Sequence, residues 1–144
     1  MTAWRARVVV VSDGVAAGER EDRGGPALRG ALEAAGAQVD AVVTCADGVD
    51  EVARALSEQC RGFAGVVVTT GGTGFGPRDL TPEGTRQVLD REAPGLAEAM
   101  RLVNPLGRLS RGGGGPPVRA LGLKPPRPPH GGGGDPRAAN AVGP

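Results

Sequence analysis

The stretch Gly65–Thr85, GVVVTTGGTGFGPRDLTPEGT, contains the pattern that decides the fold. Its β-branched run Val66–Val68 predicts a fully buried parallel strand. Four glycines follow within residues 71–76, and bare backbone lets amide N–H groups approach an anion closely. Thr81 is predicted to cap a helix whose first position is Pro82, so that the positive end of a helix dipole faces the same turn.

One acid, Asp79, lies in this glycine-rich turn. A carboxylate beside a phosphate cradle repels the ligand unless a metal ion or a reaction requires it. The turn is neither a P-loop nor a dinucleotide fingerprint, because it lacks Gly-Lys-Ser/Thr and the third glycine of G-x-G-x-x-G. On these residues alone, the turn is either an anion site or a tight crossover turn.

Strand and helix patterns alternate along the chain. We expect strands at residues 7–12, 38–43 and 66–68, a loop at 15–25, and helices at 26–35, 49–60, 81–91 and from 94 to a stop before Pro105. This order predicts a three-layer α/β domain (αβα) with a mostly parallel sheet. Because ligands of such sheets bind at the carboxyl ends of the strands, Asp13, Asp47 and the glycine-rich turn should share one edge.

Composition narrows the class of protein. The 144 residues predict one domain, and a net charge of +1 gives no case for a nucleic-acid partner. No apolar run approaches the roughly 18 residues of a membrane span, and no signal peptide is recognised, so we expect a cytoplasmic protein without a membrane partner. Cys45 and Cys60 form no CxxC pair and His130 is the only histidine, so a zinc site is not expected.

The composition changes at Gly107. Residues 107–144 contain eleven Gly and eight Pro, and six of their seven charged side chains are basic, whereas the preceding part is acidic. Such a segment lacks the apolar residues that would repay the entropy of folding. We therefore expect residues 1–106 to form the domain and residues 107–144 to form a disordered low-complexity tail.

Three stretches resemble the molybdenum-cofactor biosynthesis domain family, which includes the bacterial molybdopterin adenylyltransferase MogA and its relative MoaB. They are TTGGTGFGPRDLTPE (69–83), VVVSDGVAAGEREDRGGPAL (9–28) and DREAPGLAEAMR (90–101). The likeness covers about residues 7 to 111, and Leu109-Ser110-Arg111 is its last matching piece. The loop SDGVAAGEREDRGG leans towards the MogA branch.

The resemblance implies an enzyme that adenylylates molybdopterin with Mg-ATP, releases pyrophosphate and hands adenylyl-molybdopterin to a molybdenum-insertion enzyme. It implies that Asp47 and Asp79 are the catalytic acids, and carboxylates there can hold Mg²⁺. It also implies a homotrimer or larger assembly. The resemblance further implies substrate contacts from the segment 70–74 and from two other positions, which gives Asp13, Thr70, Gly71, Gly72, Thr73, Gly74 and Ser110.

The chain departs from the family after Arg111. The family continues with a strand, a Leu-Pro-Gly-Ser/Asn-Pro loop and a closing helix, whereas residues 112–144 read GGGGPPVRALGLKPPRPPHGGGGDPRAANAVGP. This segment is either a natural tail or the product of a reading-frame shift near Gly112. We prefer the shift, because the wrong frame of a GC-rich gene yields mainly Gly, Pro, Arg and Ala.

Because residues 112–144 depart from the family pattern, the sequence is compatible with functions of different classes. The first reading is the adenylyltransferase. The second is a non-catalytic molybdopterin-binding or oligomer-forming MoaB-like protein, inactive because the second pocket loop is missing. A third reading, a nucleotide-binding protein of an unrelated pathway, is disfavoured by the specific glycine-rich motif.

Overall fold

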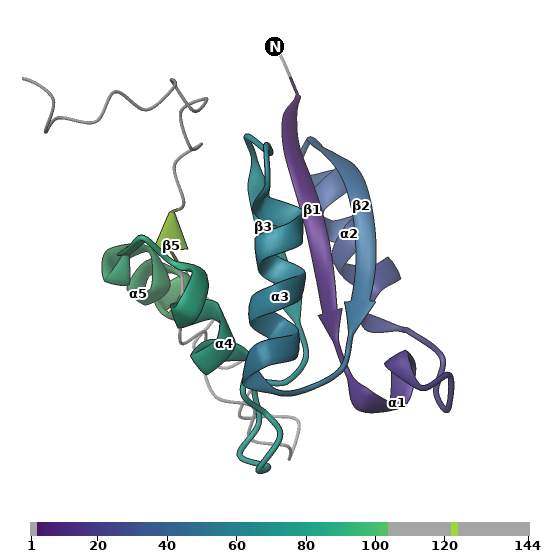
Figure 1. Cartoon of the computed structure of the whole chain (residues 1–144). Coiled ribbons are helices and arrows are strands. Elements are labelled where there is room, and N and C mark those ends of the chain that lie inside the picture. Colours follow the sequence, from purple (N-terminus) through teal and green to yellow (C-terminus); the bar gives the residue numbers. More distant parts are fainter. Residues whose placement is uncertain (1–2, 104–121, 124–144) are drawn as a thin grey trace, which may run out of the picture.

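A three-stranded parallel sheet forms the centre of the molecule in a computed structural model that describes residues 3–103 and 122–123 (Figure 1). The strand order is β2-β1-β3, and both pairs are parallel. The strands are β1 (Trp4–Val11), β2 (Ala37–Cys45) and β3 (Val66–Thr70). Strand β1 therefore lies between the other two.

Helices cover both faces of this sheet (Figure 1). The helices of the described residues are α1 (Asp13–Ala16), α2 (Gly24–Ala34), α3 (Val49–Cys60), α4 (Thr81–Val88) and α5 (Pro94–Val103), and the two that cover the faces are α2 and α3. Helix α2 packs on β1 and β2 from one side, α3 packs on the sheet from the other, and α4 packs against α3. The predicted three-layer α/β fold with a parallel sheet is confirmed. Outside the sheet, the two-residue strands β4 (Arg91–Glu92) and β5 (Gly122–Leu123) pair antiparallel.

The core is centred on β1, whose valines are buried on both faces of the sheet. Val9 and Val11 pack with Val52 and Leu56 of α3. Val10 lies on the opposite face, where its side chain approaches Gly25 of α2. Burial of one such side chain contributes roughly 1.5–3 kcal/mol, so this strand holds the two helical layers together.

Several element boundaries differ from those expected. Strand β1 begins at Trp4 rather than at residue 7, and β2 continues to Cys45. The expected loop at 15–25 is shorter, because the short helix α1 continues to Ala16 and α2 begins at Gly24 rather than at residue 26. Ser12 caps α1 by accepting a hydrogen bond from the Val15 N–H (3.4 Å). The helix expected at 81–91 ends at Val88, because Leu89 turns to extended backbone at ψ 133°.

Two expectations about the glycine-rich segment are wrong. Strand β3 is not fully buried: the exposed fraction of Val66 is 48%, because β1 is its sole neighbour among the described strands. Thr81 does not cap α4, whose N-cap is Leu80. The Thr81 hydroxyl instead donates to the Gly71 carbonyl (3.0 Å) and the Thr81 N–H to the Gly72 carbonyl (3.0 Å). The carbonyls of Gly71 and Gly72 thus hold Thr81 against the glycine-rich turn.

The expectations about the C-terminal part fall largely outside the described residues. These are the domain boundary at 106, the tail from 107 to 144, the frame shift near Gly112 and the placement of Ser110. Within residues 3–103 and 122–123, no helix has the length and apolar character needed to cross a membrane.

Candidate functional site

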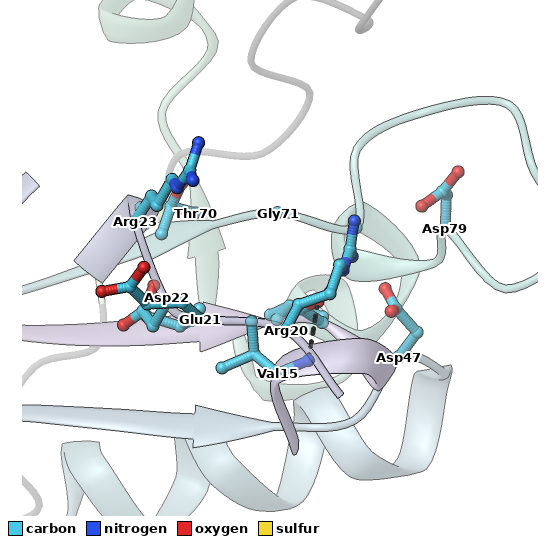
Figure 2. A pocket seen from close by; sticks show the side chains of 14 residues that line it. Val15, Arg20, Glu21, Asp22, Arg23, Asp47, Thr70, Gly71 and Asp79 are labelled. Carbon is cyan, nitrogen blue, oxygen red and sulfur yellow. Dashed lines mark hydrogen bonds between the residues drawn. The ribbon is translucent and has the colours of Figure 1, made fainter. Parts of the chain in front are cut away.

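A cavity of about 570 Å³ lies at the carboxyl ends of the three strands (Figure 2). It is lined by five of the residues expected to form a site: Asp47, Thr70, Gly71, Gly72 and Asp79. Figure 2 shows Asp47 and Asp79 at one end of the cavity and Thr70 towards the other. The predicted clustering of the strand-end loops is therefore observed.

Among the described residues, three of the other expected residues do not line this cavity: Asp13, Thr73 and Gly74. Thr73 and Gly74 follow the lining glycines along the turn but are not part of the cavity wall. Asp13 is hydrogen-bonded to Asp47 rather than facing the cavity. Ser110 lies outside the described residues.

The glycine turn passes very close to its neighbours. Gly71 has φ +95°, and a Cβ there would overlap the carbonyl oxygen of Val11. Gly72 has φ +61°, and a Cβ there would lie 2.9 Å from Asp47 Oδ1 and overlap the Thr81 hydroxyl. Only glycine fits such positions without strain. The turn therefore brings bare backbone directly against the Asp47 carboxylate.

One carboxylate oxygen of Asp47 accepts a hydrogen bond, and the other has no partner among the described residues. Its Oδ2 accepts a hydrogen bond from the Asp13 N–H (2.8 Å), and its own N–H donates to Asp13 Oδ1 (3.0 Å). Its Oδ1 is buried and has no hydrogen-bond partner among the described residues. A buried acceptor without a partner is costly, so this oxygen is suited to an incoming cation or donor.

Arg78 joins the loops that follow β1, β2 and β3. Its Nε and Nη2 donate to the two oxygens of Asp13 (2.6 and 3.0 Å), and its Nη2 also donates to the Asp47 carbonyl (2.7 Å). The hydrogen bond from Arg78 is the main reason that the pKa of Asp13 lies below its ordinary value. The sequence alone did not identify Arg78, because its partner Asp13 is 65 residues away.

Asp79 is held by its own turn. Its Oδ2 accepts a hydrogen bond from the Gly76 N–H (3.0 Å), and its N–H donates to the Gly76 carbonyl (3.1 Å). A Cβ at Gly74 would lie 2.5 Å from Asp79 Oδ2, and a Cβ at Gly76 would lie 2.8 Å from it. Glycines at both positions therefore leave room for the half-buried carboxylate of Asp79.

Charged side chains between α1 and α2 also line the cavity, in a segment predicted only to be a loop. Arg20 and Arg23 contribute guanidinium groups, and Glu21 and Asp22 contribute carboxylates. Arg20 Nη2 donates to the Ser12 hydroxyl (3.2 Å), and the Asp22 carboxylate accepts from the Gly25 N–H (2.9 Å). The available signal was that this charged run closely follows the end of a predicted strand.

The carboxylates of Asp47 and Asp79 are oxygen donors of the class that Mg²⁺ prefers. Among the described residues, no group of three or more His, Cys, Asp or Glu side chains is arranged to hold a metal. Mg²⁺ needs fewer protein ligands when a nucleotide is present, since one or two carboxylates, waters and substrate phosphates complete its shell. Asp47 Oδ1 is a carboxylate oxygen without a hydrogen-bond partner among the described residues.

Comparison with known proteins places the chain among molybdopterin proteins. The family model described as "Probable molybdopterin binding domain" matches residues 7–118. The molybdopterin adenylyltransferase of Pyrococcus furiosus is 44% identical over 85 residues, which cover 59% of this chain and 50% of that protein. The matched segment covers 50% of that protein's length, and 30% and 31% of the length of two relatives named molybdenum cofactor biosynthesis bifunctional protein, from Synechococcus elongatus and Chlorobaculum tepidum.

Solved structures agree with this comparison. The crystal structure of a molybdopterin biosynthesis protein from Mycobacterium abscessus has a TM-score of 0.73 and 36% identity, covering 85% of this chain and 75% of that one. The molybdopterin biosynthesis enzyme MoaB from Thermus thermophilus has a TM-score of 0.69 and 36% identity, covering 84% of this chain and 75% of that one.

Proposed function

The chain belongs to the molybdopterin-binding domain family of molybdenum cofactor biosynthesis, and from this premise we propose that it is a molybdopterin adenylyltransferase. In the proposed reaction, an oxygen of the terminal phosphate of molybdopterin attacks the α-phosphorus of ATP. A new P–O bond forms there, and the bond between the α-phosphorus and the bridging oxygen to the β-phosphate breaks. The products are adenylyl-molybdopterin and pyrophosphate.

One observation carries this proposal. Asp47, Asp79 and the bare backbone of Gly71 and Gly72 line a single cavity, and one Asp47 oxygen there is buried without a partner. Transfer of a phosphoryl-type group between two anions requires positioning and charge neutralisation more than a protein nucleophile. A cavity with backbone donors, carboxylates and guanidinium groups supplies these elements.

Each part of the cavity has a proposed role. The glycine-turn N–H groups hold the pterin phosphate, because backbone amides that converge in a turn form an anion-binding concavity. Thr70 extends this contact with its hydroxyl. Arg20 and Arg23 offset the negative charge of the nucleotide phosphates, since a guanidinium forms strong charge-assisted hydrogen bonds with phosphate.

Asp47 and Asp79 are proposed to hold Mg²⁺, whose bound charge would neutralise phosphate oxygens and stabilise the charge of the leaving pyrophosphate. Asp47 offers the unpartnered Oδ1, while Asp79 is oriented by the Gly76 N–H. The two acids come from different strand-end loops, so a ligand that contacts both also fixes the distance between those loops.

The test is pyrophosphate release from ATP in the presence of molybdopterin. We expect Asp79→Asn to lower turnover by about 100-fold or more, a loss typical of removing one group that stabilises transition-state charge, without a change in the melting temperature. Asp90→Asn is a matched control, because Asp90 is exposed and does not line the cavity. Unchanged turnover in Asp79→Asn would remove Asp79 from the mechanism, and an inactive parent chain would reject the enzyme assignment.

The alternative is a non-catalytic molybdopterin-binding or oligomer-forming protein of the MoaB type. The likeness to a MoaB structure favours it, as does the absence from residues 112–144 of the Leu-Pro-Gly loop expected of the family. Binding of molybdopterin without pyrophosphate release would establish this alternative.

The remaining partners are proposed from the family. We propose that adenylyl-molybdopterin passes to a molybdenum-insertion enzyme in the cytoplasm and that the chain assembles as a homotrimer or larger. Sedimentation velocity of the purified full chain tests the assembly, and a monomer at all concentrations would contradict it.

A further inference from the structure

Asp13, Asp47 and Arg78 form a closed set of hydrogen bonds at the carboxyl edge of the sheet. Asp13 and Asp47 exchange two bonds, each donating its backbone N–H to the carboxylate of the other (2.8 and 3.0 Å). Arg78 closes the set, since its guanidinium reaches both Asp13 oxygens and the Asp47 carbonyl. Three segments that are distant in sequence are joined by these five bonds.

The set leaves Asp47 with a defined orientation. Its Oδ2 is occupied by the Asp13 N–H, and its carbonyl is occupied by Arg78. Its Oδ1 has no partner among the described residues and lies against Gly72, which lines the cavity. Without Arg78, both the Asp13 carboxylate and the Asp47 backbone would lose a partner that restricts their rotation.

We infer that Arg78 is a positioning residue, which acts through Asp13 to hold the Asp47 carboxylate with its unpartnered oxygen against Gly72, in the wall of the cavity. The inference rests on the proposed function for its catalytic consequence. Arg78 is also the chain neighbour of Asp79, so the guanidinium anchors the turn that carries the second acid. One side chain thereby sets the spacing between the two acids.

A purely structural role does not account for Arg78. The Arg78 and Asp13 side chains are 61% and 46% exposed, and exposed ion pairs contribute little to stability. The guanidinium, however, makes three bonds in a fixed planar fork, which the ammonium group of lysine cannot reproduce. The geometry is more specific than stability alone would require.

The chain offers a closely matched control. Arg29 and Glu33 form an ion pair on α2 with side chains that are 53% and 46% exposed, and neither residue lines the cavity. Arg29→Gln therefore removes a comparable surface pair outside the set that holds Asp47. An effect seen in Arg78→Gln but not in Arg29→Gln therefore results from the loss of the hydrogen bonds that Arg78 makes to Asp13 and Asp47.

The first measurement uses no substrate. Amide hydrogen exchange of Asp13 and Asp47 is followed by NMR in the full chain and in Arg78→Gln, Arg78→Lys and Arg29→Gln. We expect exchange at both amides to be about five- to tenfold faster in Arg78→Gln, as for the loss of one modest hydrogen bond, and unchanged in Arg29→Gln. Unchanged exchange in Arg78→Gln would overturn the inference even if the parent chain is active.

The second measurement is the split between kcat and KM for pyrophosphate release. We expect Arg78→Gln to lower kcat by about 100-fold, as for a small misplacement of a reacting group, with little change in KM or melting temperature and partial recovery in Arg78→Lys. An unchanged kcat, or a loss of activity matched by a loss of folded protein, would overturn the inference. An inactive parent chain would reject the proposed function, and the exchange measurement would still decide whether Arg78 holds Asp47.

Discussion

Strands β1 and β3 have similar valine-rich sequences and very different surroundings. β1 is paired on both edges, and its Val8 and Val9 are fully buried. β3 is paired only with β1 among the described strands, and Val66 is 48% exposed. An apolar run therefore predicts that a segment is a strand, but the number of neighbouring strands and helices decides how deeply it is buried.

The two strands also contribute differently to the site. β1 supplies a fixed wall, because its last residues Val10 and Val11 are packed in the core and line the cavity. β3 supplies the chemistry-bearing turn, which begins where Gly71 passes against the carbonyl of Val11. The site therefore depends on one close contact between a buried strand and a more exposed one.

The largest expected effect comes from breaking that contact. Gly71→Ala would place a Cβ on the Val11 carbonyl oxygen while keeping φ near +95°, so we expect a loss of about 3–5 kcal/mol in the free energy of unfolding from strain and overpacking. Gly18→Ala is the control, since Gly18 has φ +74° with nothing within 4 Å of its Cβ position, and should cost only about 1 kcal/mol. Equal losses in urea unfolding would show that the contact between the strands is unimportant.

An intermediate effect is expected from shortening a valine in each strand, because Val9 of β1 is buried and Val66 of β3 is half exposed. Val9→Ala should lower the free energy of unfolding by about 2–3 kcal/mol, because both lost methyl groups are in the core. Val66→Ala should cost no more than about 0.5 kcal/mol, since its side chain is half exposed. Denaturant titration of both variants checks the difference, and a large loss at Val66 would mean that another segment covers β3.

Local pattern was sufficient for most of the sheet. The run of valines in β1, the amphipathic spacing of α3 and the glycine-rich turn each had a short-range signal, and the rule for strand ends brought Asp47 and Asp79 to one cavity. Arg78 had no such signal, because its role depends on a contact across 65 residues. Thr81 was misassigned for a different reason: its hydroxyl was expected to accept a bond as the helix cap, but it donates to the Gly71 carbonyl within the same turn.

The smallest expected effect concerns Asp13, which joins the two strand ends through Arg78. The pKa of Asp13 is lowered in the folded protein because Arg78 donates hydrogen bonds to it, whereas the unfolded chain has the ordinary value near 3.8. The associated stabilisation is present above that ordinary pKa and is lost as the pH falls through the lower, folded pKa. Asp13→Asn should therefore lose less stability than the parent chain on acidification from about pH 5 to about pH 2. Identical acid dependence, measured by thermal unfolding, would contradict this role of the ion pair.

The most direct test of the account is to map where Mg-ATP binds. In an NMR titration of the full chain, we expect the largest amide shifts at Asp47, at Asp79 and at residues 20–23, with smaller changes at the opposite end of the sheet. These residues line the cavity at the carboxyl ends of the strands. Shifts confined to the other end of the strands, or the absence of any saturable shift, would contradict the assignment of this cavity as the site.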